Sequence, residues 1–126
     1  MTQEDYCSFE VAKLLKEKGF NWDCITYYVD SEPDDVKYSM LFENNTTWEE
    51  RCCSAPTHQM AMKWLREKSI ECVVIPIWNT ISKQYRSYVL SDLDDKYKDN
   101  YDSYSDNISY KEAAEAVLKY SLENLI

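Results

Sequence analysis

The residues of this chain whose types are best suited to chemistry are Cys52, Cys53 and His58, which stand just ahead of a predicted helix. A helix N-terminus and a nearby imidazole can lower the pKa of a thiol and make it a nucleophile. However, His58 is the only histidine, and no third group that would orient it is visible. We therefore expect these residues to be structural and the protein not to be an enzyme. A cysteine-dependent enzyme is the weaker alternative.

Metal and cofactor sites have no clear signal in the sequence. Cys52, Cys53 and His58 lack the paired cysteine spacing of structural zinc sites. The aspartates of residues 91–107 offer the oxygen ligands that Ca²⁺ prefers, but the glycine and the closing glutamate of a calcium loop are missing. Gly19 is the only glycine, so glycine-rich phosphate loops cannot occur. We predict no metal, no cofactor and no catalytic residue.

The acid-rich segment 91–107 is the strongest candidate for a binding surface. It holds six aspartates and three tyrosines. Tyrosine contributes a large contact area to interfaces, and acidic side chains attract a basic partner. The alternative is a solvated loop whose tyrosines lie back on a sheet. The predicted partner-binding residues are Asp94, Asp95, Tyr97, Asp99, Tyr101 and Tyr104.

Composition and charge exclude several classes of function. With 126 residues, of which 44% are hydrophobic, the chain is expected to form one domain over residues 1–126. The net charge of −9 argues against direct binding of nucleic acid and against docking on anionic membranes. The sequence shows neither an export signal nor a membrane-spanning run, which predicts a cytoplasmic protein. Five cysteines, an odd number, then predict reduced and unpaired thiols.

Two similar helical segments must position these residues. Val11–Lys18 and Ala61–Lys68 lie fifty residues apart and share four of eight residues. In both, the apolar side chains fall on one face of a helix. Each segment leads into a strand-like stretch that begins at a cysteine, Cys24 or Cys72, and a second strand-like stretch follows. This repeat predicts two helix–strand–strand units.

Local signals give the bounds of the predicted elements. Ser8 and Gly19 are suited to the two ends of a first helix, and Ser109 with Glu112 forms a capping box for a last one. Pro76 should lie at a bulge or near the end of a central strand. The predicted elements are a helix over 9–18, strands over 24–29 and 36–42, a polar connection over 43–53, a helix that follows the start signal 54–57 and runs to about 68, strands over 71–78 and 84–90, a loop over 91–107 and a helix from 109 to the C-terminus.

These elements predict an α+β fold in the order α-β-β-α-β-β-α. A four-stranded antiparallel sheet would carry the three helices on one face, and the two units would be related by approximate two-fold pseudosymmetry. Aromatic side chains on the other face would be partly exposed or would meet a partner. A homodimer through this open face is one such arrangement. The tyrosines concerned would be some of Tyr27, Tyr28, Tyr38, Tyr85 and Tyr88.

Three blocks of the sequence resemble a known group of proteins: Ser8–Phe20, Cys53–Thr57 with Gln59–Glu67, and Tyr110–Ile126. Together they are similar to a family of small proteins without an assigned activity, from gut anaerobic bacteria and their phages and prophages. The resemblance implies a cytoplasmic setting and a phage-linked, accessory role. The family frequently has a cysteine where this chain has Ser121, so the resemblance implies no functional thiol there.

The leading functional interpretation is a small, acidic, non-enzymatic interaction module. It would bind a protein partner with a basic surface, as a phage-linked modulator or inhibitor of a host protein. The alternative from another class is a protein that binds or sequesters a small ligand, in a pocket near the connection 43–58.

Overall fold

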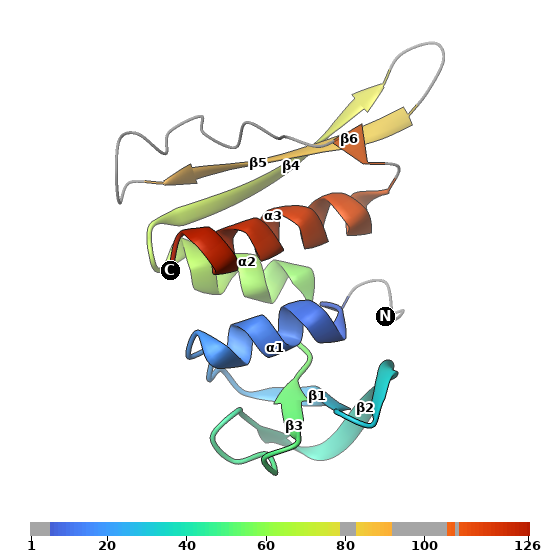
Figure 1. Ribbon diagram of the computed structural model, residues 1–126, viewed down its shortest axis with the longest axis vertical. Coiled ribbons are helices and arrows are strands. Elements are labelled where there is room, and N and C mark those ends of the chain that lie inside the picture. Colours follow the sequence, from blue (N-terminus) through green and yellow to red (C-terminus); the bar gives the residue numbers. More distant parts are fainter. Residues whose placement is uncertain (1–5, 79–82, 92–105, 108) are drawn as a thin grey trace. The chain divides into compact units, whose positions relative to one another are not determined.

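The computed structural model describes residues 6–78, 83–91, 106–107 and 109–126, and it is an α+β fold with three helices and two antiparallel sheets (Figure 1). The chain divides into two compact units, Met1–Ala61 and Met62–Ile126. The division falls inside helix α2 (His58–Arg66). Whether both units form one domain stays a prediction. No helix of the described residues is long and apolar enough to cross a membrane.

The predicted helix ends are confirmed at both ends of the chain. Helix α1 (Phe9–Glu17) begins after Ser8, whose hydroxyl accepts a hydrogen bond from a backbone N–H in the first turn at 3.2 Å. It ends before Gly19, which has a φ of +95° that glycine adopts without strain. Helix α3 (Tyr110–Asn124) begins in the same way at Ser109. These interactions span only three residues, so the sequence alone reveals them.

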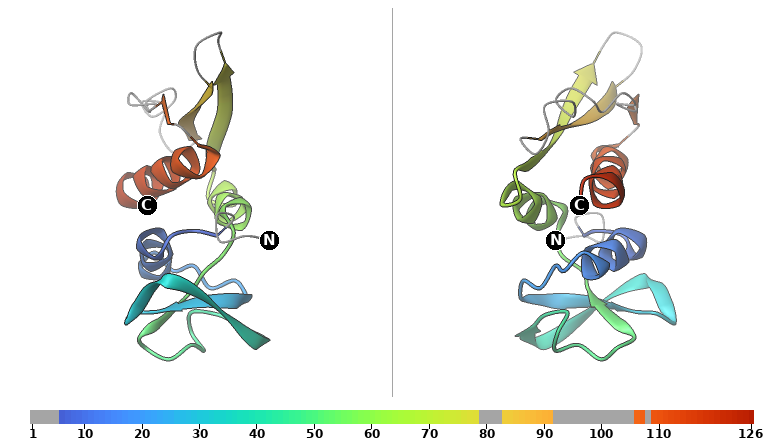
Figure 2. Two further views of the ribbon diagram at one scale, coloured as in Figure 1. Left: turned by 90° about the vertical axis from the view of Figure 1, so that its right-hand side faces the viewer. Right: turned by 60° about the vertical axis from the view of Figure 1, so that its left-hand side comes forward.

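The first sheet lies in the first unit and has the strand order β2-β1-β3. It consists of β1 (Cys24–Val29), β2 (Glu32–Glu43) and β3 (Cys52–Ser54). Alternate side chains of β1 are buried, and helix α1 covers that face of the sheet (Figure 2). Tyr28 of β1 packs edge-on against Phe9 of α1, with ring centroids 5.7 Å apart.

The second sheet lies in the second unit and has the strand order β4-β5-β6. It consists of β4 (Ile70–Trp78), β5 (Lys83–Ser91) and the two-residue strand β6 (Asp106–Asn107). Helix α3 packs against β4 and β5. The apolar side chains Val117, Leu118 and Leu122 of α3 are fully buried, as expected from their helical spacing.

The prediction of one four-stranded sheet with three helices on one face is wrong, because the two hairpins belong to separate sheets and each gains a short third strand. β3, from the segment predicted as a polar connection, pairs with β1 on the side opposite β2. β6, from the segment predicted as a loop, pairs with β5 on the side opposite β4. The hairpin β1–β2 therefore gains β3 at one edge, and the hairpin β4–β5 gains β6 at one edge.

The predictions for strand 71–78 and for the repeat are corrected in the same way. β4 lies at the edge of its sheet, and its register with β5 is regular through Pro76. Since an edge strand has one side without ladder partners, the missing N–H of proline is tolerated there. Both units begin with a helix and a hairpin, but the third strand joins the first strand of one hairpin and the second strand of the other. The repeat does not extend to this third strand.

Candidate protein-interaction surface

The partner-binding residues predicted from the sequence lie outside the described part of the chain. They are Asp94, Asp95, Tyr97, Asp99, Tyr101 and Tyr104. Their role stays a prediction, and the site must be built from other residues.

The cysteine and histidine candidates are buried in the first unit. Cys53 is 2% exposed, in a cluster of buried side chains with Tyr28 and Ala12, and His58 is 3% exposed at the start of α2. Burial raises the pKa of the Cys53 thiol to about 11, and burial also raises the pKa of Cys52. Because the thiolate is the reactive form, this environment is the opposite of the one that activates a nucleophile.

The described residues contain no cluster of His, Cys, Asp and Glu side chains suited to a metal ion. Among those residues, no group of three or more His, Cys, Asp or Glu side chains is placed so that it could hold a metal ion. All five cysteines are buried free thiols, which confirms the prediction of unpaired cysteines.

The most unusual feature of the first sheet is a large irregular bulge in β2. In the β1–β2 register, Cys24 lies opposite Glu43 and Thr26 lies opposite Tyr38. Four residues of β2, Ser39–Phe42, therefore lie opposite the single residue Ile25. We call Ser39–Phe42 the β2 bulge. Extra residues in a bulge leave the ladder, so their side chains do not follow the inside–outside alternation of a strand.

Three consecutive apolar side chains of the β2 bulge are exposed to solvent. Met40 is 99% exposed, Leu41 is 71% exposed and Phe42 is 72% exposed. The adjacent Tyr38 is 61% exposed and makes an edge contact with Tyr6, with ring centroids 6.4 Å apart. Contiguous exposed apolar side chains on a folded unit are typical of interaction sites, whereas single ones are ordinary.

Polar side chains form hydrogen bonds within the β2 bulge and attach the chain that follows it. Ser39 accepts a hydrogen bond from the N–H of Leu41 at 3.1 Å, and its hydroxyl donates to Glu43 at 3.4 Å. Directly after the strand, the Asn44 amide donates to the Asp23 carboxylate at 3.1 Å, and the Asn45 amide donates to the carbonyl of Phe20 at 2.7 Å. The exposed apolar side chains thus project from a segment with defined attachments.

The surroundings of the β2 bulge are acidic. Between positions 23 and 50 the sequence has eight acidic residues and a single basic one, Lys37. Lys37 donates hydrogen bonds to Glu32 and Asp35, and these bonds raise its pKa. This cation is therefore already paired, and Arg51, which follows Glu50, lies 3.7 Å from the Glu49 carboxylate. The acids are Asp23, Asp30, Glu32, Asp34, Asp35, Glu43, Glu49 and Glu50.

No similarity supplies a function for these features. No protein-family model matches the sequence, and neither a curated protein nor a solved structure shows a significant similarity to it. The resemblance stated above therefore continues to depend on the three sequence blocks, and the function must be inferred from the structure.

A cavity lies at the connection between β2 and β3. It has a volume of about 330 Å³. Tyr27 and Trp48, which both line it, stack with ring centroids 4.6 Å apart, and the Trp48 indole donates to Ser54 at 2.7 Å. Glu43, Glu49 and Arg51 add charged groups to the lining. This cavity lies near the connection 43–58, as predicted for a small-ligand pocket, but strands and the connection line it and no helix residue does.

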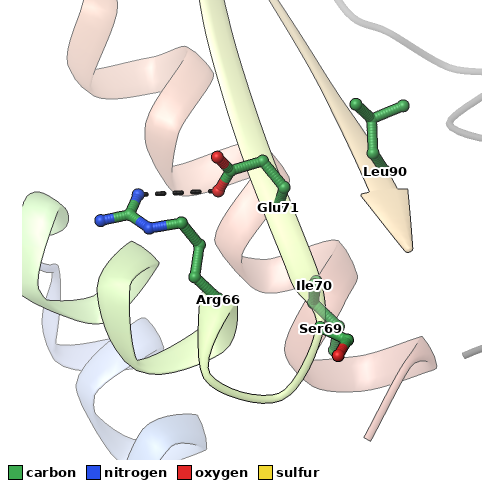
Figure 3. Close-up of a pocket in the computed structure, with 5 residues that line it drawn as sticks. All are labelled: Arg66, Ser69, Ile70, Glu71 and Leu90. Atoms are coloured by element: carbon green, nitrogen blue, oxygen red, sulfur yellow. Dashed lines mark ion pairs between the residues drawn. The ribbon is translucent and has the colours of Figure 1, made fainter. Parts of the chain in front are cut away.

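A second cavity, of about 370 Å³, lies within the second unit beside the turn from α2 to β4 (Figure 3). Arg66 extends from α2 toward Glu71 of β4, and their charged groups are 3.6 Å apart. Ser69, in the turn, has a φ of +65°, a left-handed conformation that is uncommon for residues other than glycine. The two charged groups of this cavity, Arg66 and Glu71, are thus already an ion pair.

Sequence reasoning missed the β2 bulge although a signal was present. Residues 36–42 were predicted as an ordinary strand, in which Met40 and Phe42 would face one side and Leu41 the other. A half-buried strand alternates apolar and polar side chains, and three consecutive apolar residues at its end break this alternation. The break marks the start of the irregular segment.

Proposed function

We propose that this chain is a small, acidic, non-enzymatic interaction module that binds a protein partner with a basic surface. The observation that supports it most is the exposure of Met40, Leu41 and Phe42 in one attached bulge. Burying a large apolar side chain contributes roughly 1.5–3 kcal/mol. Three such side chains offer a partner a driving force that offsets part of the entropy lost on association.

The charge of the first unit supports a basic partner. The eight acids around the first sheet would attract lysine and arginine side chains and repel acidic surfaces. The resemblance to phage-linked proteins favours a host protein as the partner, with the chain acting in the cytoplasm as its modulator or inhibitor. A reducing cytoplasm also suits five free thiols.

Quantitative capture from a lysate of a gut anaerobic bacterium tests this function. We expect the wild-type chain to retain a basic protein, and Leu41→Ser or Phe42→Ser to reduce its recovery about tenfold. Ile75→Ser is the matched control, since Ile75 is an exposed apolar side chain of the second unit at 37% exposure. Equal recovery with the wild-type chain and the three variants would show that the β2 bulge is not the binding surface. Circular dichroism melting should show that the variants remain folded.

A second function, binding of a small ligand, is favoured by the cavity at the connection between β2 and β3. Its volume of about 330 Å³ falls at the lower end of the range of ligand pockets. The carboxylates of Glu43 and Glu49 beside an aromatic stack would suit a small cationic molecule. A thermal-shift screen that finds such a molecule, with the stabilisation lost in Glu43→Gln, would favour this second function over the first.

A further inference from the structure

We propose that the β2 bulge binds an amphipathic helical segment of the partner protein, with an apolar stripe flanked by lysine or arginine side chains. This inference depends on the proposed function and specifies the chemistry of the partner.

The size of the exposed apolar segment fits one helix. The four residues of the β2 bulge lie opposite the single residue Ile25, so they form a short, compact protrusion. An α-helix with its side chains is about 10–12 Å wide. One helix is therefore wide enough to cover the bulge with its apolar stripe, while its flanks meet the neighbouring parts of the sheet.

Acidic side chains lie on both sides of the apolar segment along the chain. On one side, Glu43 follows Phe42 directly and accepts from Ser39. On the same side, Asp23 is joined to the end of β2 by the Asn44 amide. On the other side, the first half of β2 holds three acids, Glu32, Asp34 and Asp35, against one cation, Lys37, which pairs with Glu32 and Asp35. An apolar centre between two acidic flanks is complementary to an apolar stripe between two basic flanks.

Addition of a partner strand to β2 is a poorer explanation of the same surface. Pairing along an edge needs regular backbone donors and acceptors. β2 has register shifts at both ends of its pairing with β1, and Pro33 has no N–H to donate. The N–H of Leu41 already donates to Ser39. Contact through side chains therefore fits the bulge better than contact through backbone.

A second copy of this chain is also a poorer occupant. Two copies that met through the β2 bulge would bring together two sets of the eight acids around the first sheet. Of the two cations near this surface, Lys37 contacts Glu32 and Asp35 and Arg51 lies 3.7 Å from Glu49, so the acids remain in excess in each copy. Like-charge repulsion opposes self-association at this surface, whereas a basic helix is attracted to it.

Fluorescence anisotropy with synthetic peptides tests the inference. The probe is a labelled helix of leucine and lysine, about 18 residues long, with an apolar stripe between lysines. The control peptide keeps every lysine and replaces each leucine by glutamine. We expect the wild-type chain to bind the leucine peptide about tenfold more tightly than the glutamine peptide, and Phe42→Ser to remove this preference. Ile75→Ser should retain it.

Three results would overturn the inference. The first is the absence of a preference for the leucine peptide in the wild-type chain, and the second is a preference that persists in Phe42→Ser. The third is a dimer in light scattering that Phe42→Ser dissociates, which would make a second copy the occupant. If the preference is absent while capture from the lysate still depends on Leu41 and Phe42, the proposed function stands and only the helical partner is wrong.

Discussion

Burial determines the chemistry of the cysteine side chains. Cys24, Cys53 and Cys72 lie in three different parts of the chain, and burial raises the pKa of each thiol to about 11 from the ordinary 9.0. At neutral pH these thiols are therefore protonated. Cys72 contacts the hydroxyl of Ser121 at 3.5 Å, so its sulfur takes part in the packing of α3 on the second sheet. The cysteines act here as small core residues.

Raised thiol pKa values predict a loss of stability at alkaline pH. Between pH 9 and pH 11 an exposed thiol of the unfolded chain loses its proton while Cys53 of the folded chain keeps it. The unfolded state then binds fewer protons, so the free energy of unfolding falls as the pH rises, by at most about 1.4 kcal/mol per pH unit for each thiol. Urea unfolding at pH 8, 9 and 10 measures this slope.

Cys53→Ala isolates the contribution of this thiol. Tyrosines and lysines titrate in both proteins, but only the wild-type chain has the Cys53 thiol. The free energy of unfolding of Cys53→Ala should therefore fall less steeply above pH 9 than that of the wild-type chain. Parallel slopes would show that Cys53 is not protected in the folded state. The same variant should leave any binding activity unchanged.

At the scale of the element, interactions close in sequence were predictable and distant ones were not. Ser8, Gly19 and Ser109 mark helix ends through hydrogen bonds or backbone angles within a few residues. β3 is three residues long, and it is a strand only because Tyr28 meets Cys53, twenty-five positions later. Such a short segment has no periodicity of its own, so neither the pairing nor the split into two sheets could be predicted.

The repeated helices show how one sequence pattern serves two local purposes. Lys16 of α1 and Arg66 of α2 occupy matching positions of the repeat. The ammonium group of Lys16 donates to the carbonyl oxygens of Glu50 at 2.9 Å and Cys52 at 2.7 Å, which joins α1 to the start of β3. Arg66 instead pairs with the Glu71 carboxylate. The charge is retained, and its acceptors differ.

Lys16→Met should destabilise the fold through β3. The change keeps the aliphatic stem but leaves two backbone carbonyls without their charged donor, so the free energy of unfolding should fall by about 1–2 kcal/mol. Chemical denaturation measures it. Lys63→Met is the matched control, since Lys63 is an exposed lysine in the matching helix, and its effect should stay within about 0.5 kcal/mol. Equal effects of both changes would contradict the role of Lys16.

At the scale of the whole molecule, acidic charge is divided between the sheet around the β2 bulge and the segment 91–107. The second of these regions lies outside the described residues, and its proposed role is attraction of the partner. Charges at a rim act mainly on the rate of association, whereas buried apolar contacts act mainly on the rate of dissociation. The two proposed surfaces should therefore affect different rate constants.

Kinetic measurements with the captured partner, or with the leucine–lysine helix, separate these roles. Replacing Asp94, Asp95 and Asp99 by asparagine should slow association, and salt above about 0.15 M should slow association of the wild-type chain. Phe42→Ser should instead speed dissociation. Tyr101→Ala should weaken binding more than any single aspartate change. If replacing the three aspartates together with Tyr101 changes neither rate, the segment 91–107 takes no part in binding.

The exposure of Met40 has a consequence for redox chemistry. At 99% exposure its thioether is open to peroxide, whereas Met62, at 4%, is shielded. Oxidation converts methionine into a polar sulfoxide, and methionine sulfoxide reductases reverse the change. A sulfoxide at position 40 would stand in the middle of an apolar contact surface without disturbing the core beneath it. Exposure to oxidants would then weaken partner binding reversibly while the chain stays folded.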